Sequence, residues 1–197
     1  MKTIVGIDEV GRGPVAGPVA VCSFVIFDEA IIDEMKNFAV SLRDSKQLSK
    51  RSRELWFDRL NDFQKQEKCD FCVSMVSANE IDRIGISKAI KKALAETLDI
   101  LECENDVLVL LDGSLHAPAT FKNQVTIIKG DEKEPAISFA SIVAKVTRDR
   151  YMTEQAKKFP KYGFENHVGY GTRAHYQAIK KYGMTKLHRR SFLKNFK

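Results

Sequence analysis

The hydrophobic positions of the chain predict alternating strands and helices. Five short apolar or alternating runs have the length and residue types of strands, and we expect them at 2–8, 15–27, 69–76, 107–111 and 125–128. The fourth run is continuously apolar, as in a buried central strand. Gly17 and Pro18 predict an irregular start to the second strand.

Apolar residues at helical spacing fill the segments between these strands. A short helix is predicted near 29–41, and a second one is capped by Ser49. A third helical stretch starts after Ser77, is interrupted at Gly85 and resumes through Leu101. Two further helices are predicted from Pro135 to about Tyr151 and from Thr172 to Gly183. The second helix carries Leu55, Trp56, Leu60 and Phe63 at helical spacing, and its aromatic residues are expected in the core rather than in a site. The order of elements predicts a mixed α/β fold with an antiparallel start and parallel additions.

Composition adds the size and setting of this fold. The 197 residues are 44% hydrophobic and 29% charged, which is typical of one globular domain with a sizeable core. No apolar stretch is long enough to cross a membrane, and no signal peptide is recognised. The four cysteines are scattered, which favours a reducing, cytoplasmic location. Cys69 and Cys72 have the spacing of half a zinc site, but no second pair completes it.

Charge is unevenly distributed along the chain. Residues 1–150 contain 21 Lys+Arg and 24 Asp+Glu, a net charge of −3, whereas residues 151–197 contain 11 Lys+Arg and 2 Asp+Glu, a net charge of +9. A basic end on a near-neutral body is typical of a polyanion-binding surface. A lysine-rich face exposed to solvent is the alternative explanation.

Acidic residues follow three of the predicted strands. Asp8 and Glu9 end the first strand, Asp112 ends the fourth, and Asp131 follows the fifth. Ligands of open α/β sheets gather at strand ends, and four carboxylates balance two divalent cations of the kind that hydrolyse phosphodiesters. Neighbouring strand residues point to opposite faces, so Asp8 and Glu9 share a pocket only if the chain bends at the nearby glycines. Each acid alone is equally explained by a solvated strand end or a turn.

Several distinctive motifs are spread over the whole length of the chain. They are Gly6-Ile7-Asp8-Glu9-Val10-Gly11-Arg12-Gly13-Pro14, Asp44-Ser45-Lys46-Gln47-Leu48-Ser49, Leu111-Asp112-Gly113, Lys129-Gly130-Asp131, the helix from Ala140 to Asp149, Tyr162-Gly163-Phe164, His167-Val168-Gly169-Tyr170-Gly171-Thr172 and His188-Arg189-Arg190-Ser191-Phe192. In these motifs the chain resembles bacterial ribonuclease HII, the type 2 ribonuclease H family. The number of motifs in one order excludes a chance resemblance.

The resemblance implies an RNase H-like fold, with a five-stranded mixed sheet flanked by helices. It implies a catalytic core over 1–158 and a C-terminal helical, substrate-binding extension over 159–197 in the same folding unit. The implied activity is cleavage of RNA in RNA–DNA hybrids and cutting 5′ of single ribonucleotides in duplex DNA, leaving 3′-hydroxyl and 5′-phosphate ends. The implied role is removal of ribonucleotides and RNA primers from DNA, and the implied cofactors are two Mg²⁺ or Mn²⁺ ions.

The resemblance also assigns roles to individual residues. The catalytic, metal-binding acids would be Asp8, Glu9, Asp112 and Asp131, and the substrate-binding residues would be Gly11, Arg12, Gly13, Lys46 and Tyr170. The Gly-Arg-Gly loop would read the ribose 2′-hydroxyl, which alone separates RNA from DNA at one sugar. Glycine lets the backbone approach that sugar closely. Tyr170 would stack on the next sugar, and Lys46 would lie near a phosphate.

The sequence departs from the family pattern at Val168, where many members have lysine, which puts one phosphate contact in doubt. The related ribonuclease HIII family differs in the Gly-Arg-Gly loop and has an added N-terminal domain. The histidines are expected to have no catalytic part, and His188 with Arg189 is expected at the surface or on a phosphate. The alternative function is a catalytically silent hybrid-binding protein of the same fold. A monomer is expected.

Overall fold

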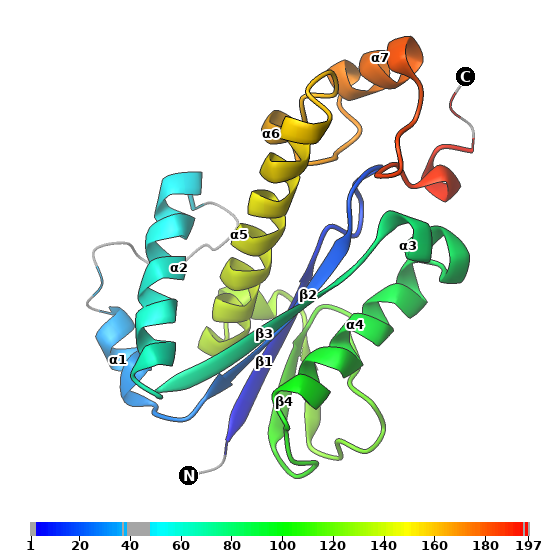
Figure 1. Cartoon of the computed structure of the whole chain (residues 1–197). Helices are drawn as coiled ribbons and strands as arrows, with labels where there is room; N and C mark the ends of the chain where they lie inside the picture. Colours follow the sequence, from blue (N-terminus) through cyan, green and yellow to red (C-terminus); the bar gives the residue numbers. More distant parts are fainter. Residues whose placement is uncertain (1–2, 37, 39–47, 195, 197) are drawn as a thin grey trace.

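A five-stranded mixed sheet forms the centre of the computed structural model, which describes residues 3–36, 38, 48–194 and 196. The strands are β1 (Ile4–Val10), β2 (Val19–Ile26), β3 (Cys69–Val76), β4 (Leu108–Asp112) and β5 (Gln124–Ile127). Their order across the sheet is β3-β2-β1-β4-β5 (Figure 1). β1 pairs with β2 and β2 with β3 in antiparallel fashion, while β4 and β5 are added in parallel. The predicted mixed sheet is therefore confirmed.

Helices cover both faces of this sheet. They are α1 (Ala30–Lys36), α2 (Lys50–Lys65), α3 (Ala78–Ile84), α4 (Ile86–Ile100), α5 (Pro135–Lys158), α6 (Phe164–His167) and α7 (Arg173–Tyr182), with short 3-10 turns at Gly130–Glu132 and Arg190–Phe192. The predicted caps Ser49, Ser77 and Thr172 each accept a backbone N–H of the first helical turn. The helix predicted over 29–41 is observed only as α1, and most of its remainder lies outside the described residues.

Two predicted boundaries were wrong. The second strand begins at Val19 rather than residue 15, because the carbonyls of Ala16 and Pro18 accept hydrogen bonds from Arg148 instead of a neighbouring strand. Gly17 lies there at a φ of 88°, outside the strand region. The helix expected to end near Tyr151 continues to Lys158, so that α5 extends beyond the edge of the sheet (Figure 1).

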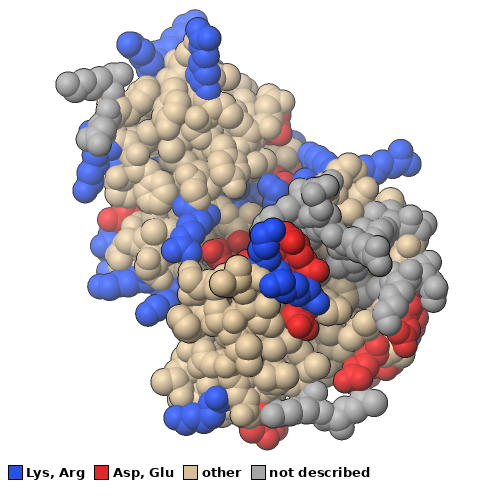
Figure 2. Space-filling model, turned by 180° about the vertical axis from the view of Figure 1, so that it is seen from behind, with Lys and Arg blue, Asp and Glu red and all other residues tan. Residues whose placement is uncertain are grey.

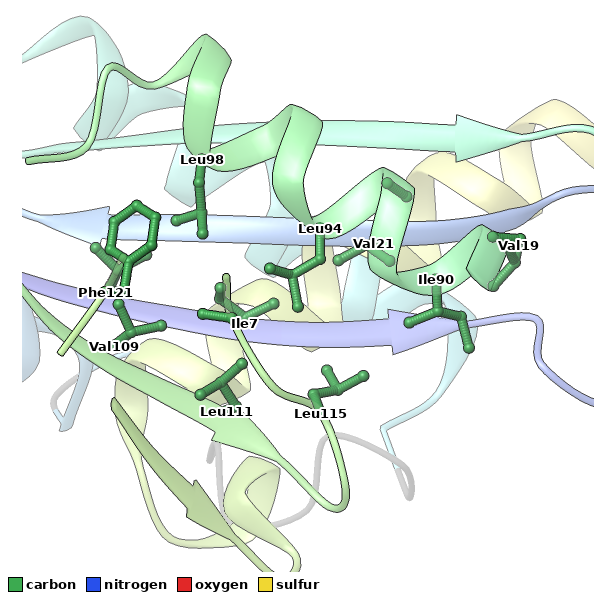
Figure 3. Close-up of a cluster of buried hydrophobic side chains, with 14 of the residues drawn as sticks. Ile7, Val19, Val21, Ile90, Leu94, Leu98, Val109, Leu111, Leu115 and Phe121 are labelled. Carbon is green, nitrogen blue, oxygen red and sulfur yellow. The ribbon is translucent and has the colours of Figure 1, made fainter. Parts of the chain in front are cut away.

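One face of the sheet packs against α4. Figure 3 shows side chains of α4 interlocking with those of β1, β2 and β4, and the labelled residues of this cluster are Ile7, Val19, Val21, Ile90, Leu94, Leu98, Val109, Leu111, Leu115 and Phe121. All of them are buried. Within this layer the hydroxyls of Ser23 and Thr97 pair at 2.7 Å, so these buried polar groups are satisfied.

The other face packs against α2 and α5. Trp56 and Phe63 of α2 are fully buried there, as predicted, together with Leu60, whereas Leu55 of the same apolar pattern is 45% exposed. α5 lies directly on β1, and a Cβ at Gly6 would be 2.1 Å from the carbonyl carbon of Ala136. The absence of a side chain at Gly6 therefore sets the distance between α5 and the strand that carries Asp8.

We expect Gly6→Ala to destabilise the fold severely. The added methyl would meet the backbone of α5 at a distance that no atom can accept, so the helix must shift as a body, and overpacking of this kind costs about 1–3 kcal/mol or more. The measurement is the urea midpoint followed by circular dichroism. Gly13→Ala is the matched control, because Gly13, like Gly6, has no positive φ, and the atom nearest to its added carbon is Cε1 of Tyr170 at 3.9 Å. Equal losses in the two variants would contradict the proposed close contact.

A third apolar cluster joins the C-terminal segment to the end of α5. Its buried residues are Val15, Ala16, Met152, Ala156, Tyr162, Phe164, Ile179, Leu187 and Leu193. A β-bridge pairs Ala16 with His188. The C-terminal segment therefore packs against the chain between β1 and β2, whereas the predicted division at residues 158 and 159 stays a prediction. No helix in the described part of the chain is long and apolar enough to span a membrane.

Candidate active site

The sheet brings Asp8 and Asp112 to the same edge. β1 and β4 are parallel with Ile7 opposite Leu111, so each aspartate is the next residue along its strand. Asp112 Oδ1 accepts the backbone N–H of Gly130 at 2.7 Å, which ties the turn after β5 to this edge. Asp131 follows Gly130 in a 3-10 turn and is fully buried.

Three of the four predicted acids line one cleft of about 370 Å³. Its lining residues are Asp8, Glu9, Val10, Gly11, Arg12, Gly13, Arg53, Asp112, Ser141, Ile142, Lys145 and Tyr170. Asp131, the residue after Gly130, is fully buried and is not among the residues that line the cleft. Within the described residues, no three His, Cys, Asp or Glu side chains are already grouped closely enough to hold a metal ion. The cleft is thus an open group of carboxylates beside basic side chains.

Asp8 and Glu9 reach the cleft without a bend in β1. The strand stays paired with β2 as far as Val10, so the two side chains leave opposite faces of the sheet. The turn comes one residue later, at Gly11 with a φ of 88°. The sequence predicts a bend at the nearby glycines. The chain does turn at one of them, Gly11, but only after both acids, and both acids line the cleft.

Burial controls the protonation of the two adjacent acids. Loss of water raises the pKa of Asp8 to about 8, against a hydrogen bond from Ser141 that lowers it, and Glu9 and Asp112 raise it further. Burial also raises the pKa of Glu9, while Arg12, whose guanidinium lies 3.4 Å from Glu9 Oε1, opposes the shift. Negative charge at this strand end is therefore unfavourable unless a cation accompanies it.

The Gly-Arg-Gly loop and Tyr170 lie together, as the resemblance implied. A Cβ at Gly13 would lie 3.9 Å from Cε1 of Tyr170, and the carbonyl of Gly169 accepts N–H groups of Val15 and Ala16 at 3.0 and 3.2 Å. The ring of Tyr170 is 45% exposed, so its surface is accessible from the cleft. Lys46, the ninth predicted site residue, lies outside the described residues.

Two buried arginines hold the backbone of this loop, and the sequence analysis missed both roles. Arg148 of α5 donates to the carbonyls of Pro18 (2.8 Å), Ala16 (3.3 Å) and Val168 (3.0 Å). Arg189 donates to the carbonyls of Gly17 (2.9 Å), Arg12 (3.1 Å) and Gly11 (2.6 Å).

These hydrogen bonds correct the expectation for the C-terminal basic motif. Arg189 and His188 are buried rather than exposed. Burial lowers the pKa of Arg189 to about 9 and also lowers the pKa of Arg148, because carbonyl oxygens replace water without supplying a full negative charge. Part of the basic charge after residue 150 therefore acts inside the protein, on the loop that carries Gly11 and Gly13.

One face of α5 supplies contacts along the whole site. Ser141 reaches Asp8, Lys145 lines the cleft, Arg148 holds the loop, and Met152 packs against Gly17. Their spacing of four, three and four residues is that of one helix face, which is the sequence signal that identifies them as a group. Arg53 of α2 also lines the cleft and was missed. Figure 2 shows acidic and basic side chains next to one another in the middle of one face of the molecule.

Val168, the departure from the family pattern, adopts a left-handed backbone with a φ of 44°. A β-branched residue is unusual in that region. Its carbonyl still accepts from Arg148, and its side chain packs against the third cluster. Val168 comes one residue before Gly169 and Tyr170, which lie next to the Gly-Arg-Gly loop.

Comparisons with known proteins agree with this geometry. The family model for ribonuclease HII matches residues 5–195. The ribonuclease HII of Clostridium beijerinckii is 44% identical over 98% of this chain and 68% of its own length, and that of Caldicellulosiruptor bescii is 43% identical over 98% and 88%.

Solved structures show the same fold. The ribonuclease HII of Archaeoglobus fulgidus, solved with PCNA, has a TM-score of 0.76 at 26% identity and covers 95% of this chain and 93% of its own. Bst-RNase HIII, solved with Mn²⁺, has a TM-score of 0.68 at 16% identity and covers 100% of this chain and 70% of its own. The RNase H-like fold is thereby confirmed. Together with the full-length sequence match, it places this chain in the ribonuclease HII family, the enzymes that cleave the RNA of RNA–DNA hybrids.

Proposed function

We propose that the cleft recognises a single ribonucleotide within duplex DNA and cuts on its 5′ side, leaving 3′-hydroxyl and 5′-phosphate ends. The observation that carries the proposal is the position of the carboxylates of Asp8, Glu9 and Asp112 in the same cleft as the contact between Gly13 and Tyr170. The residues that recognise one sugar then lie beside the carboxylates that take part in hydrolysis of the adjacent phosphodiester bond of the same strand.

The set of carboxylates at the cleft has the chemistry to bind two divalent cations, Mg²⁺ or Mn²⁺. Asp8, Glu9 and Asp112 offer hard oxygen ligands at a cleft wall, and Asp131 follows the residue that anchors Asp112. The raised pKa of Asp8 supports this assignment, because a nearby cation relieves the unfavourable charge. When bound, such ions activate water and stabilise the leaving oxygen of an in-line displacement. The Mn²⁺ complex of Bst-RNase HIII is consistent with this choice of ion.

The chain's own residues orient the reacting groups. Gly130 holds one oxygen of Asp112, and Ser141 holds Asp8, so each keeps a fixed direction toward the cleft. Arg53 and Lys145 both line the cleft and supply positive charge for the phosphates of the cut strand, Lys145 while paired with Asp149 at 2.8 Å. Arg148 and Arg189 use the donors of their guanidinium groups on loop carbonyls, which fixes the backbone of the loop beside the cleft.

The experiment that tests the function uses three duplexes labelled at the 5′ end. One contains a single ribonucleotide, one is all DNA, and one is a long RNA–DNA hybrid. We expect a single cut 5′ of the ribonucleotide with a 3′-hydroxyl end, cutting of the hybrid, and no cutting of all-DNA duplex. Binding to the hybrid without cleavage would support the catalytically silent alternative instead. Cutting of the all-DNA duplex would contradict ribose recognition.

The basic C-terminal part predicts a steep salt dependence. Each phosphate that the protein neutralises releases counterions and adds about 0.9 to the slope of log affinity against log salt concentration. Figure 2 shows basic side chains gathered at the end of the molecule where α7 lies. We expect Lys180→Gln with Lys181→Gln, both exposed on α7, to lower that slope by about 1–2.

The matched control for this prediction is Lys122→Gln. Lys122 is also exposed, but it precedes β5 and thus lies at the strand end away from the acids. Its slope should equal that of the wild type. A slope unchanged in the α7 variant would mean that these lysines face solvent in the complex.

A further inference from the structure

A chain of hydrogen bonds runs through two buried histidines to the backbone of Tyr170. The N–H of Thr185 donates to His188 Nδ1 at 2.8 Å. His188 Nε2 and His175 Nε2 are 3.1 Å apart, and His175 Nδ1 lies 2.8 Å from the carbonyl oxygen of Tyr170. Both imidazoles are almost completely shielded from solvent.

These hydrogen bonds permit one arrangement of protons. A backbone N–H only donates, so His188 Nδ1 accepts and its proton is on Nε2. His175 Nε2 must then accept from His188, which places the proton of His175 on Nδ1. That proton points at the carbonyl of Tyr170, which can only accept. Every group in the chain of hydrogen bonds is satisfied when both rings are neutral.

The surroundings keep the two rings neutral and fixed. Burial lowers the pKa of each to about 4. The ring of His167 stacks on His175 with centroids 4.3 Å apart, and Phe164 meets His175 edge-on at 5.4 Å. Protonation of His175 would set two N–H groups against each other across the 3.1 Å contact, and protonation of His188 would set its Nδ1–H against the N–H of Thr185.

We propose that His175 and His188 are positioning residues that set the orientation of Tyr170 through this relay of hydrogen bonds. The inference rests on the proposed role of Tyr170 in reading the substrate sugar. The ring of Tyr170 is about half exposed beside the Gly13 loop, so packing holds it only in part and the backbone behind it must supply the rigidity. The relay supplies that rigidity from Thr185, fifteen positions further along the chain.

The first test needs neither substrate nor activity. ¹⁵N-detected NMR of the full chain between pH 6 and 8 should show His175 protonated at Nδ1, His188 protonated at Nε2, and no titration of either. The opposite tautomer of His175, or titration of either ring in this range, would overturn the relay.

The second test compares disruptive and conservative variants. His175→Phe removes the donor to the Tyr170 carbonyl, whereas His175→Asn keeps an N–H close to the position of Nδ1. We expect His175→Phe to change the ring signals of Tyr170 and to lower kcat/KM on a single-ribonucleotide duplex about tenfold, which is typical when one buried hydrogen bond is removed. His175→Asn should retain most activity. If the Phe variant does not fold, His188→Phe against His188→Gln gives the same comparison.

A double-variant cycle separates this inference from the proposed function. In a Tyr170→Ala background, His175→Phe should have no further effect on kcat/KM. A full additional loss there would overturn the relay as a positioning device while leaving the role of Tyr170 intact. If Tyr170→Ala alone has no effect, the proposed function of Tyr170 fails. In that case the relay is judged by the NMR signals of Tyr170, and unchanged signals in His175→Phe would overturn it as well.

Discussion

Asp112→Asn and Asp8→Asn are each expected to lower the single-turnover cleavage rate about 10³-fold or more at saturating Mg²⁺. Each change removes a carboxylate from the cleft edge while keeping its shape, and the charge that it contributes to holding a cation is worth several kcal/mol in the transition state. Affinity for the hybrid should stay within a few-fold of wild type, because the basic surfaces are unchanged. Turnover near wild type in Asp112→Asn would contradict the assignment of these acids.

The stability of Asp8→Asn distinguishes impaired chemistry from impaired folding. In the metal-free protein, burial raises the pKa of Asp8 from 3.8 to about 8, so the folded state binds more protons than the unfolded state between these values. The stabilising contribution of the protonated carboxyl is complete below about pH 4 and is lost as the pH rises through 8. We therefore expect Asp8→Asn to raise the Tm of the metal-free protein at pH 8 and to leave it nearly unchanged at pH 4. A lower Tm at pH 8 would contradict this explanation.

Tyr170→Ala is the second large effect, with an expected decrease of about one to two powers of ten in kcat/KM on a single embedded ribonucleotide. The change removes both the ring surface beside Gly13 and the hydroxyl, and a buried polar group left without its partner costs roughly 1–3 kcal/mol. The decrease should be smaller on a long hybrid, where many registers and phosphate contacts compensate.

Tyr170→Phe is the matched control, because it keeps the ring and removes only the hydroxyl. Its effect should be smaller than that of Tyr170→Ala on both substrates. Since the ring is 45% exposed, neither change should alter the circular dichroism or Tm by much. Equal activity of all three proteins would make Tyr170 a structural residue only.

The residues of the site that could be predicted from the sequence are those that follow the ends of strands. Asp8 and Asp112 follow apolar runs, and parallel pairing of two such runs necessarily places the next residues side by side. Asp131 was placed at the same edge by the same reasoning, but it lies fully buried in the 3-10 turn after β5 and does not line the cleft. A turn of this kind leaves no periodic signal in a sequence.

The support for the site was less predictable, because it depends on tertiary contacts. Arg148 and Arg189 come from elements far apart in sequence. The fold brings them together because both donate hydrogen bonds to carbonyls of the segment between β1 and β2. A single arginine in a basic segment is indistinguishable from a solvated one until its neighbours are known. The same holds for His175 and His188, whose pairing across 3.1 Å cannot be inferred from spacing along the chain. Ser141, Lys145 and Arg148 do share a pattern, one face of α5, from which a sequence analysis could have grouped them.

The most direct test of the central claim is anomalous diffraction from crystals grown with Mn²⁺ and an uncleavable single-ribonucleotide duplex. The structure predicts bound ions in contact with the carboxylates of Asp8 and Asp112, with the ribose against Gly13 and Tyr170. The Asp112→Asn protein should lose ion density at that edge while still binding the duplex. Mn²⁺ bound elsewhere, with none at Asp8 or Asp112 beside a correctly seated substrate, would contradict the account.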